Sequence, residues 1–314
     1  MKKFFLRVSG REQGLKQAAH DLFAGQSRND VLETAVRVLE LDPADDSVGY
    51  GGFPNLLGAM ELDGAFMDGD SRNCGAVAGI TNFLPVAVAR RLMQCGLHTF
   101  LLGHGAEIFA QESGLQPEQT LSDAQRDKWE REVKPLLDGH GSKSLMDIVR
   151  HMTFPGERNW DTTVMIASDG MGLSCAASTA GWPYKHPGRA GDTPIIGAGL
   201  YVDSRVGGAA CTHTGEMSTR AGTARFVVAQ METGKSPRDA VRAAIENVAH
   251  LSGGLLRTLV VHAIDRNGDA HAAAVNAGAP VYFQYWNEDL PQPECRQSEA
   301  VSLFSRAGAQ APFC

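Results

Sequence analysis

The feature that most constrains this chain is a predicted β-hairpin near its middle. Residues 162–167 and 173–177 are short runs rich in β-branched or small residues. The segment 169–172 between them begins with Asp-Gly, which is typical of a tight hairpin turn. The sequence therefore predicts two antiparallel strands, with Thr162 at the start of the first.

Thr162 is our candidate nucleophile. A threonine hydroxyl is a weak nucleophile at its own pKa, and the free α-amine of the same residue can activate it as a base. That amine exists only if the bond between Asp161 and Thr162 is cut. The tripeptide Asp-Thr-Thr is common by itself, so these residues alone leave a second interpretation open, in which a buried strand simply follows a loop.

The chain of 314 residues is predicted to be a single domain, because no Pro/Ser-rich linker or internal repeat divides it. Sequence patterns predict helices over residues 11–24, 30–41, 85–93 and 106–111, and another after Ser236. Further strands are predicted over residues 62–67, 76–80, 98–102, 257–264, 270–275 and 281–286. Strands in hairpins with helices in separate runs are typical of a layered α+β protein. The charged residues 115–160 are predicted to be a slack connector, with a surface helix over 122–137 as the alternative.

Charge and composition exclude several classes of protein. With 29 basic and 36 acidic residues the net charge is -7, so we expect no nucleic-acid partner. No apolar run approaches a membrane span, and Arg7 interrupts the apolar start too early for a signal peptide, so we expect a cytoplasmic protein without a membrane partner. The six cysteines show no metal-ligand spacing, which favours reduced thiols and no metal, although an even count also permits disulfides.

Three other patterns are incomplete versions of known sites. Residues 172–176 lack the closing glycine of a serine nucleophile elbow. Residues 197–199 begin like a dinucleotide-binding fingerprint, but the third glycine is absent and no helix-forming stretch follows. His98 and His104 belong to no metal pattern such as HExxH. We interpret these residues as a strand, a close-packed turn and structural histidines.

Further motifs lie on both sides of the predicted hairpin. They occupy residues 47–52, 67–69, 74–77, 98–103, 178–181, 185–194, 197–203 and 211–216. Together with Asp161-Thr162, this series resembles the glycosylasparaginases, which are N-terminal nucleophile hydrolases. The related isoaspartyl peptidases with asparaginase activity typically have glycine before the cleaved bond. The resemblance implies a four-layer αββα sandwich, cut into an α chain of residues 1–161 and a β chain of residues 162–314.

The resemblance also implies the roles of the catalytic residues. Thr162 supplies the nucleophile and, through its free amine, the base. The hydroxyl of Thr179 orients that amine. The hydroxyl of Thr212 and the backbone N–H of His213 stabilise the oxyanion. Asp161 assists the autoprocessing step.

Arg189 and Asp192 are candidates for an amino-acid clamp. They lie three residues apart in a glycine-rich loop and offer a guanidinium for an α-carboxylate and a carboxylate for an α-ammonium. The residues alone leave a surface ion pair as the simpler interpretation. The resemblance implies the clamp, with the carbonyl of Gly215 also holding the ammonium and Ser47 among the substrate-binding residues.

Three positions depart from the family pattern. His213 stands where relatives usually have glycine, and Trp160 stands where they usually have histidine. Relatives also carry a substrate-contacting tryptophan near the mature N-terminus, where this chain has residues 4–11 without one. We therefore expect altered processing and an altered leaving-group side, with the aspartyl side retained.

The sequence thus predicts an autoprocessing amidohydrolase without a cofactor. Its predicted substrate is the side-chain amide of N4-(β-N-acetylglucosaminyl)-L-asparagine or of a related asparagine derivative, which it cleaves through a threonyl acyl-enzyme. An L-asparaginase or β-aspartyl peptidase is the alternative enzyme, and an unprocessed amino-acid-binding protein is the alternative outside catalysis. The resemblance implies a homodimer of αβ units.

Overall fold

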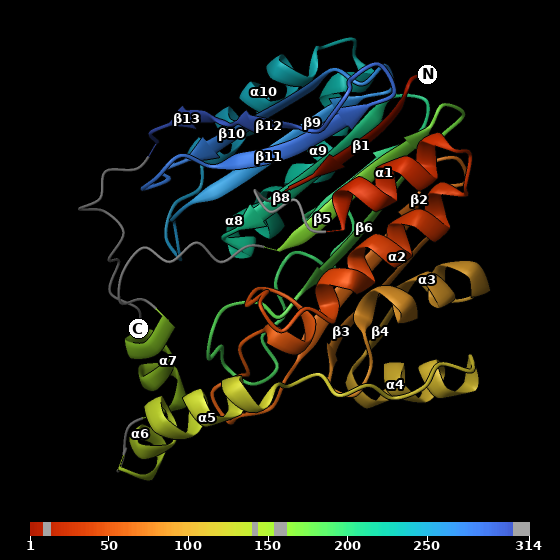
Figure 1. Ribbon diagram of the computed structural model, residues 1–314. Helices are drawn as coiled ribbons and strands as arrows, with labels where there is room; N and C mark the ends of the chain where they lie inside the picture. The colour runs from red at the N-terminus through yellow and green to blue at the C-terminus, as the bar shows by residue number, and fades with distance from the viewer. Residues whose placement is uncertain (9–13, 140–143, 154–161, 304–314) are drawn as a thin grey trace.

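The computed structural model describes residues 1–8, 14–139, 144–153 and 162–303, which contain two β-sheets (Figure 1). Within these residues, the first sheet has eight strands in the spatial order β12 (Glu294–Gln297), β11 (Tyr282–Asn287), β1 (Lys3–Arg7), β5 (Thr163–Asp169), β6 (Leu173–Thr179), β2 (Leu62–Asp68), β3 (Cys74–Ile80) and β4 (Phe100–Leu102). The second has five, in the order β13 (Glu299–Val301), β10 (Ala270–Val275), β9 (Leu259–Asp265), β8 (Gly207–His213) and β7 (Leu200–Asp203). The chain is an α+β protein, as predicted.

The predicted central hairpin is present. β5 and β6 are antiparallel, with Thr163 opposite Ser178. At the turn, Gly170 has a φ of 89°, in the left-handed region that favours glycine. Asp169 accepts the backbone N–H of Gly172 at 2.9 Å and so closes the turn. This register places the residue before β5 beside the last residue of β6.

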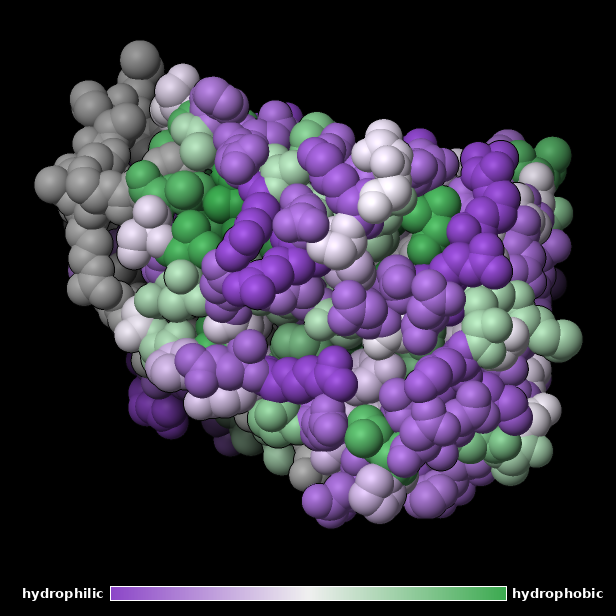
Figure 2. Space-filling view, turned by 90° about the horizontal axis from the view of Figure 1, so that it is seen from above, coloured by the Kyte–Doolittle hydropathy of each residue, from purple (hydrophilic) through white to green (hydrophobic). Residues whose placement is uncertain are grey.

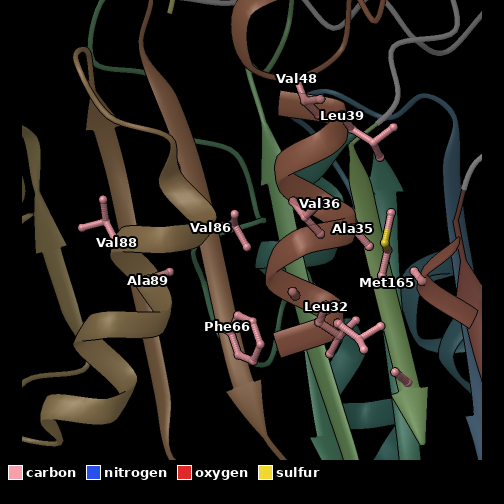
Figure 3. Packing of buried hydrophobic residues seen from close by; sticks show 14 of the residues in the cluster. Leu32, Ala35, Val36, Leu39, Val48, Phe66, Val86, Val88, Ala89 and Met165 are labelled. Atoms are coloured by element: carbon pink, nitrogen blue, oxygen red, sulfur yellow. The ribbon is translucent and has the colours of Figure 1, made fainter. Parts of the chain in front are cut away.

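Helices α1 (Leu15–Phe23), α2 (Arg28–Glu40), α3 (Pro85–Cys95) and α4 (Gly103–Glu112) pack on the first sheet. The buried side of α2 carries apolar residues at helical spacing, namely Leu32, Ala35, Val36 and Leu39. Figure 3 shows them in one cluster with Met165 of β5, Phe66 of β2 and Val86 of α3. The helices predicted on this side of the molecule are therefore confirmed, apart from residues 11–13 of the first, which lie outside the described residues.

Helices α8 (Gly215–Ala221), α9 (Thr223–Glu232) and α10 (Pro237–Ala249) pack on the second sheet. α10 begins as predicted, with the Ser236 hydroxyl accepting the backbone N–H of Asp239 at 3.2 Å. Its buried stripe includes Val241, Ala244, Ile245 and Val248. Figure 1 shows α10 and α2 on opposite sides of the paired sheets.

A further apolar cluster lies where the two sheets face each other. It joins Val164 and Ile166 of β5 to Val202 of β7 and Ile264 of β9. β6 of the first sheet also neighbours β7 and β8 of the second. The two sheets therefore share a core, which brings the start of β5 close to the strand ends of the second sheet.

Residues 123–138 form α5 (Asp123–Glu132) and α6 (Lys134–Asp138), and α7 (Leu145–Thr153) follows. The Ser122 hydroxyl caps α5 by accepting the backbone N–H of Gln125 at 3.3 Å. A small core that includes Phe53 and Tyr184 anchors this region. The short helix η1 (Gly49–Gly51) also contacts it, because the carbonyl of Gly51 accepts a side-chain N–H of Gln125 at 2.8 Å. The surface-helix alternative is confirmed for residues 123–138, so the slack connector is wrong there. The rest of the connector prediction includes residues 140–143 and 154–160, which lie outside the described residues.

The surface is uneven in polarity. The face seen from above in Figure 2 is mainly hydrophilic, with apolar side chains in small groups. Around the free edge strand β4, by contrast, Leu97, Phe100, Leu102 and Ile108 are 75%, 43%, 62% and 44% exposed. Among the described residues, no helix is both long and apolar enough to cross a bilayer.

Candidate active site

A shallow cleft opens beside the start of β5, with about 290 Å³ of empty space that is partly open to solvent. Its walls come from both sheets and from the loop that follows β6. The lining residues are Thr162, Thr179, Gly181, Trp182, Arg189, Gly191, Asp192, Thr193 and His213. Five of the residues that the sequence singled out are therefore in one place. In the part of the chain that the structure describes, no three His, Cys, Asp or Glu side chains are placed to hold a metal ion together.

Thr162 and Thr179 lie side by side in this cleft. Thr162 is half-buried one residue before β5, and Thr179 is the buried last residue of β6. Their hydroxyl oxygens are 3.3 Å apart. The oxygen of Thr179 also accepts the backbone N–H of Gly181 at 2.9 Å, which fixes its position. Strand pairing thus holds a second hydroxyl within hydrogen-bonding reach of the candidate nucleophile.

The second sheet contributes His213, the last residue of β8, to the cleft wall, whereas Thr212 before it is buried and is not among the lining residues. His213 has a φ of 79°, a left-handed conformation that strains any residue other than glycine. Its Nδ1 lies 3.1 Å from the hydroxyl of Thr212, and its backbone carbonyl accepts the indole N–H of Trp182 at 3.3 Å. The glycine expected here from the resemblance would adopt this conformation freely.

Arg189 and Asp192 each have another partner. Nε and Nη2 of Arg189 donate to the carboxylate of Glu216 at 3.0 to 3.1 Å. Asp192 is 4% exposed, and its carboxylate accepts the hydroxyl of Ser218. The interpretation of Arg189 and Asp192 as a surface ion pair is therefore wrong, because the nearest opposite charge in the sequence is not the nearest in space.

Gly215 begins α8 directly against Asp192. A Cβ at Gly215 would lie 2.6 Å from Oδ1 of Asp192 and 2.7 Å from its backbone nitrogen. Only glycine permits this approach without a shift of the backbone. The carbonyl of Gly215 also lies 3.0 Å from the hydroxyl of Ser218, so Gly215 and Ser218 form one polar group with Asp192, the member of the three that lines the cleft.

Ser47 and Asp161 are the remaining predicted site residues. The carbonyl of Ser47 accepts the backbone N–H of Ala180 at 2.9 Å, immediately after Thr179. The hydroxyl of Ser47 donates to the carboxylate of Asp45. In the described part of the chain, Ser47 therefore supports the loop after β6, and its contact with substrate stays a prediction. Asp161, like Trp160, lies outside the described residues.

Two buried charged side chains lie behind the loop that carries the clamp. Lys185 and Asp63 are 1% and 0% exposed, and Nζ lies 3.8 Å from Oδ2. Burial lowers the pKa of Lys185, and its Nζ donates to the carbonyl of Glu61 at 2.9 Å. The carboxylate of Glu61 accepts the N–H of Gly188 at 3.0 Å, and that of Asp63 accepts the N–H of Gly191 at 3.4 Å. Residues at the start of β2 thus bind the backbone on both sides of Arg189.

Sequence reasoning gave no role to four side chains in or beside the cleft, those of Trp182, Thr193, Glu216 and Ser218. Glu216 and Ser218 follow Gly215 by one and three residues in the first turn of α8. A helix that starts against a loop presents its first turn to that loop. The acid and the hydroxyl in this first turn could therefore have predicted partners for Arg189 and Asp192. Trp182 gave no such signal, because its partners depend on tertiary structure.

The sequence is similar to one family along most of its length. The profile of the family described as Asparaginase matches residues 7–289. An N(4)-(Beta-N-acetylglucosaminyl)-L-asparaginase of Elizabethkingia miricola is 36% identical over 264 residues, which are 82% of this chain and 74% of that protein. An isoaspartyl peptidase/L-asparaginase of Mus musculus is 34% identical over 276 residues, 85% of this chain and 80% of that protein.

A relative from an archaeon extends this similarity. A plant-type L-asparaginase of Pyrococcus furiosus is 33% identical over 269 residues, which cover 84% of this chain and 85% of that protein. The match thus includes the strands and loops that form the cleft, and it includes relatives of both kinds that the sequence motifs suggested. The chain belongs to the asparaginase family, as its motifs predicted.

Proposed function

We propose that this chain is an autoprocessing amidohydrolase that cleaves the side-chain amide of N4-(β-N-acetylglucosaminyl)-L-asparagine or of a related asparagine derivative. The observation that carries the proposal is one cleft in which Thr162 lies beside a guanidinium and a buried carboxylate. Relatives named as N(4)-(Beta-N-acetylglucosaminyl)-L-asparaginase and as isoaspartyl peptidase/L-asparaginase support asparagine derivatives as the substrate class.

In the proposed reaction, Thr162 acts through its free α-amine, which takes the hydroxyl proton as the oxygen attacks the amide carbon. The hydroxyl of Thr212 and the backbone N–H of His213 stabilise the oxyanion. The amide nitrogen leaves with a proton from the amine, and water hydrolyses the threonyl ester to release aspartate. Arg189 binds the α-carboxylate and Asp192 the α-ammonium in both steps.

The same threonine generates its own amine. The hydroxyl oxygen of Thr162 attacks the carbonyl carbon of Asp161, and the carboxylate of Asp161 assists deprotonation. The peptide C–N bond between the two residues then breaks, which frees the α-amine, and water hydrolyses the resulting ester. The products are an α chain of residues 1–161 and a β chain of residues 162–314. The position of Thr162 one residue before β5 supports this step, because strand pairing retains the new terminus in the cleft.

The proposal includes the four-layer αββα arrangement, within one domain made of both chains. Three apolar clusters support it. The first lies between α1–α4 and the first sheet, the second between the two sheets, and the third between the second sheet and α8–α10. Each sheet then has one helical face and one face toward the other sheet.

We further propose a homodimer of αβ units in the cytoplasm. The exposed apolar side chains around β4 support self-association, because such patches are unusual on monomeric proteins.

The cysteines support the compartment and the surface supports the dimer. The structure describes free thiols at Cys74, Cys95, Cys175, Cys211 and Cys295, which favour a reducing compartment. Light scattering of the purified protein tests the dimer, and a mass of one αβ unit at micromolar concentration would contradict it.

A comparison of three substrates tests the function. Aspartate release is measured as kcat/KM for the glycosylated asparagine, free asparagine and a β-aspartyl dipeptide. Because the N-terminal tryptophan of relatives is absent, we expect the preference for the sugar to be reduced by about 10- to 200-fold. L-asparaginase or β-aspartyl peptidase activity is the second candidate, supported by the relatives at 34% and 33% identity. Release of aspartate from none of the three would exclude both enzymes.

The acidity of Asp192 predicts a pH dependence. Burial raises the pKa of Asp192 to about 6, and the Ser218 hydroxyl acts in the opposite direction. An α-ammonium binds the ionised form, so kcat/KM should fall more steeply with acidity once the pH drops below about 6. Ser218→Ala removes a hydrogen bond to the carboxylate. The break in the pH profile, which is the pH below which kcat/KM falls more steeply, should therefore move to higher pH.

A second serine provides the control for this pH profile. Ser236→Ala removes a hydroxyl that caps α10 outside the cleft, so the break should stay where it is in the wild type. If the break in Ser218→Ala also stays, Asp192 is not the group that titrates.

A further inference from the structure

Trp182 contacts both the residues assigned to substrate binding and those assigned to the oxyanion. It is half-buried in the loop after β6 and lines the cleft. The face of its indole lies against Arg189, whose guanidinium carbon is 4.2 Å from the ring centroid. Its indole N–H donates to the backbone carbonyl of His213 at 3.3 Å. One side chain therefore joins the two halves of the site.

The contact with His213 has a conformational consequence. At a φ of 79°, the Cβ of a residue other than glycine crowds the backbone. Such strain persists only where the surroundings hold it. Here the Trp182 indole binds the carbonyl and the Thr212 hydroxyl lies beside the imidazole. Trp182 thus supports a backbone shape that glycine would adopt unaided.

The contact with Arg189 fixes which edge of the guanidinium faces the cleft. Glu216 binds Nε and Nη2, and the Trp182 ring covers one face of the group. Nη1 lies against two glycines of the cleft wall, since a Cβ at Gly181 would be 3.2 Å from it and a Cβ at Gly191 would be 3.3 Å from it. Nη1 is therefore the edge available to a carboxylate in the cleft.

We propose that Trp182 is a positioning residue that sets both ends of the reaction geometry. Its ring face holds Arg189 for the α-carboxylate, and its N–H holds His213 for the oxyanion. The inference rests on the proposed function, which assigns what those two residues bind. The two contributions are chemically separable, because phenylalanine keeps an aromatic face and loses the N–H, whereas leucine loses both.

A double-mutant cycle tests the proposal. Trp182→Phe should lower kcat about tenfold and change KM less than about threefold, because the carbonyl of His213 loses its donor. In a His213→Gly background the same substitution should change kcat less than about twofold, because glycine needs no support. Trp182→Leu should also raise KM about tenfold, because Arg189 loses the ring beneath it.

Trp286→Phe is the matched control, since it removes an indole N–H that donates to the Leu290 carbonyl at 2.9 Å outside the cleft. It should leave kcat and KM unchanged. Thermal unfolding gives a readout without substrate: Trp182→Phe should lower the midpoint by about 2 °C only when residue 213 is histidine. If Trp182→Phe lowers kcat and the midpoint equally with histidine and with glycine at residue 213, the proposal is overturned. An inactive wild type overturns the proposed function instead, and the midpoints then decide the role of Trp182.

Discussion

Thr162→Ala is expected to remain one uncut polypeptide of 314 residues and to lose hydrolytic activity by at least about 10⁴-fold. Both losses have the same cause, because the hydroxyl that attacks the preceding carbonyl is also the hydroxyl that attacks substrate. The neighbouring hydroxyl of Thr179, 3.3 Å away, cannot replace it, because it carries no terminal amine. Intact mass under denaturing conditions measures cutting, and aspartate release measures hydrolysis.

Two controls make this result specific. Thr162→Ser keeps a hydroxyl and an amine, so it should still give two fragments, though more slowly. Thr233→Ala removes an exposed threonine hydroxyl at the end of α9 and should match the wild type. A wild-type chain that stays whole after prolonged incubation and releases no aspartate would favour the amino-acid-binding protein over the enzyme.

Local features of the fold were predictable because short-range chemistry decides them. Asp-Gly at 169–170 predicts the turn that joins β5 to β6, and Asn-Gly at 267–268 lies at the equivalent turn between β9 and β10. Gly268, like Gly170, has a positive φ, which explains why glycine marks the position. Ser236 predicts the start of α10 to the residue, because its hydroxyl binds a backbone N–H only three residues away.

Features that depend on distant partners were missed. β1 lies in the interior of the first sheet, yet Lys3–Arg7 has no turn signal beside it and pairs with β5 and β11, which are far away in the sequence. Strand formation there depends on packing against those neighbours more than on intrinsic propensity. The same limit applies to the site, where Arg189 binds Glu216, 27 residues further along the chain.

Arg189→Lys is expected to raise KM about 10- to 100-fold for substrates that carry an α-carboxylate, with a smaller change in kcat. Lysine keeps the charge. Lysine lacks the planar guanidinium of Arg189. That group binds Glu216 through Nε and Nη2, stacks on Trp182 and at the same time presents Nη1 to the cleft. A substrate analogue without the α-carboxylate should show the same kcat/KM in the wild type and the variant. Autoprocessing should continue, because it needs no substrate.

A second arginine in the same chain offers a chemically matched control. Arg225 lies over the ring of Tyr201 at 5.0 Å and donates to Glu232 at 3.1 Å, so it repeats the stacking and the ion pair on α9 outside the cleft. Arg225→Lys loses the same kinds of contact and should leave KM unchanged. If both variants raise KM equally, the effect comes from general destabilisation. If Arg189→Lys leaves KM unchanged, the α-carboxylate binds elsewhere, and the clamp assignment fails while the role of Thr162 stands.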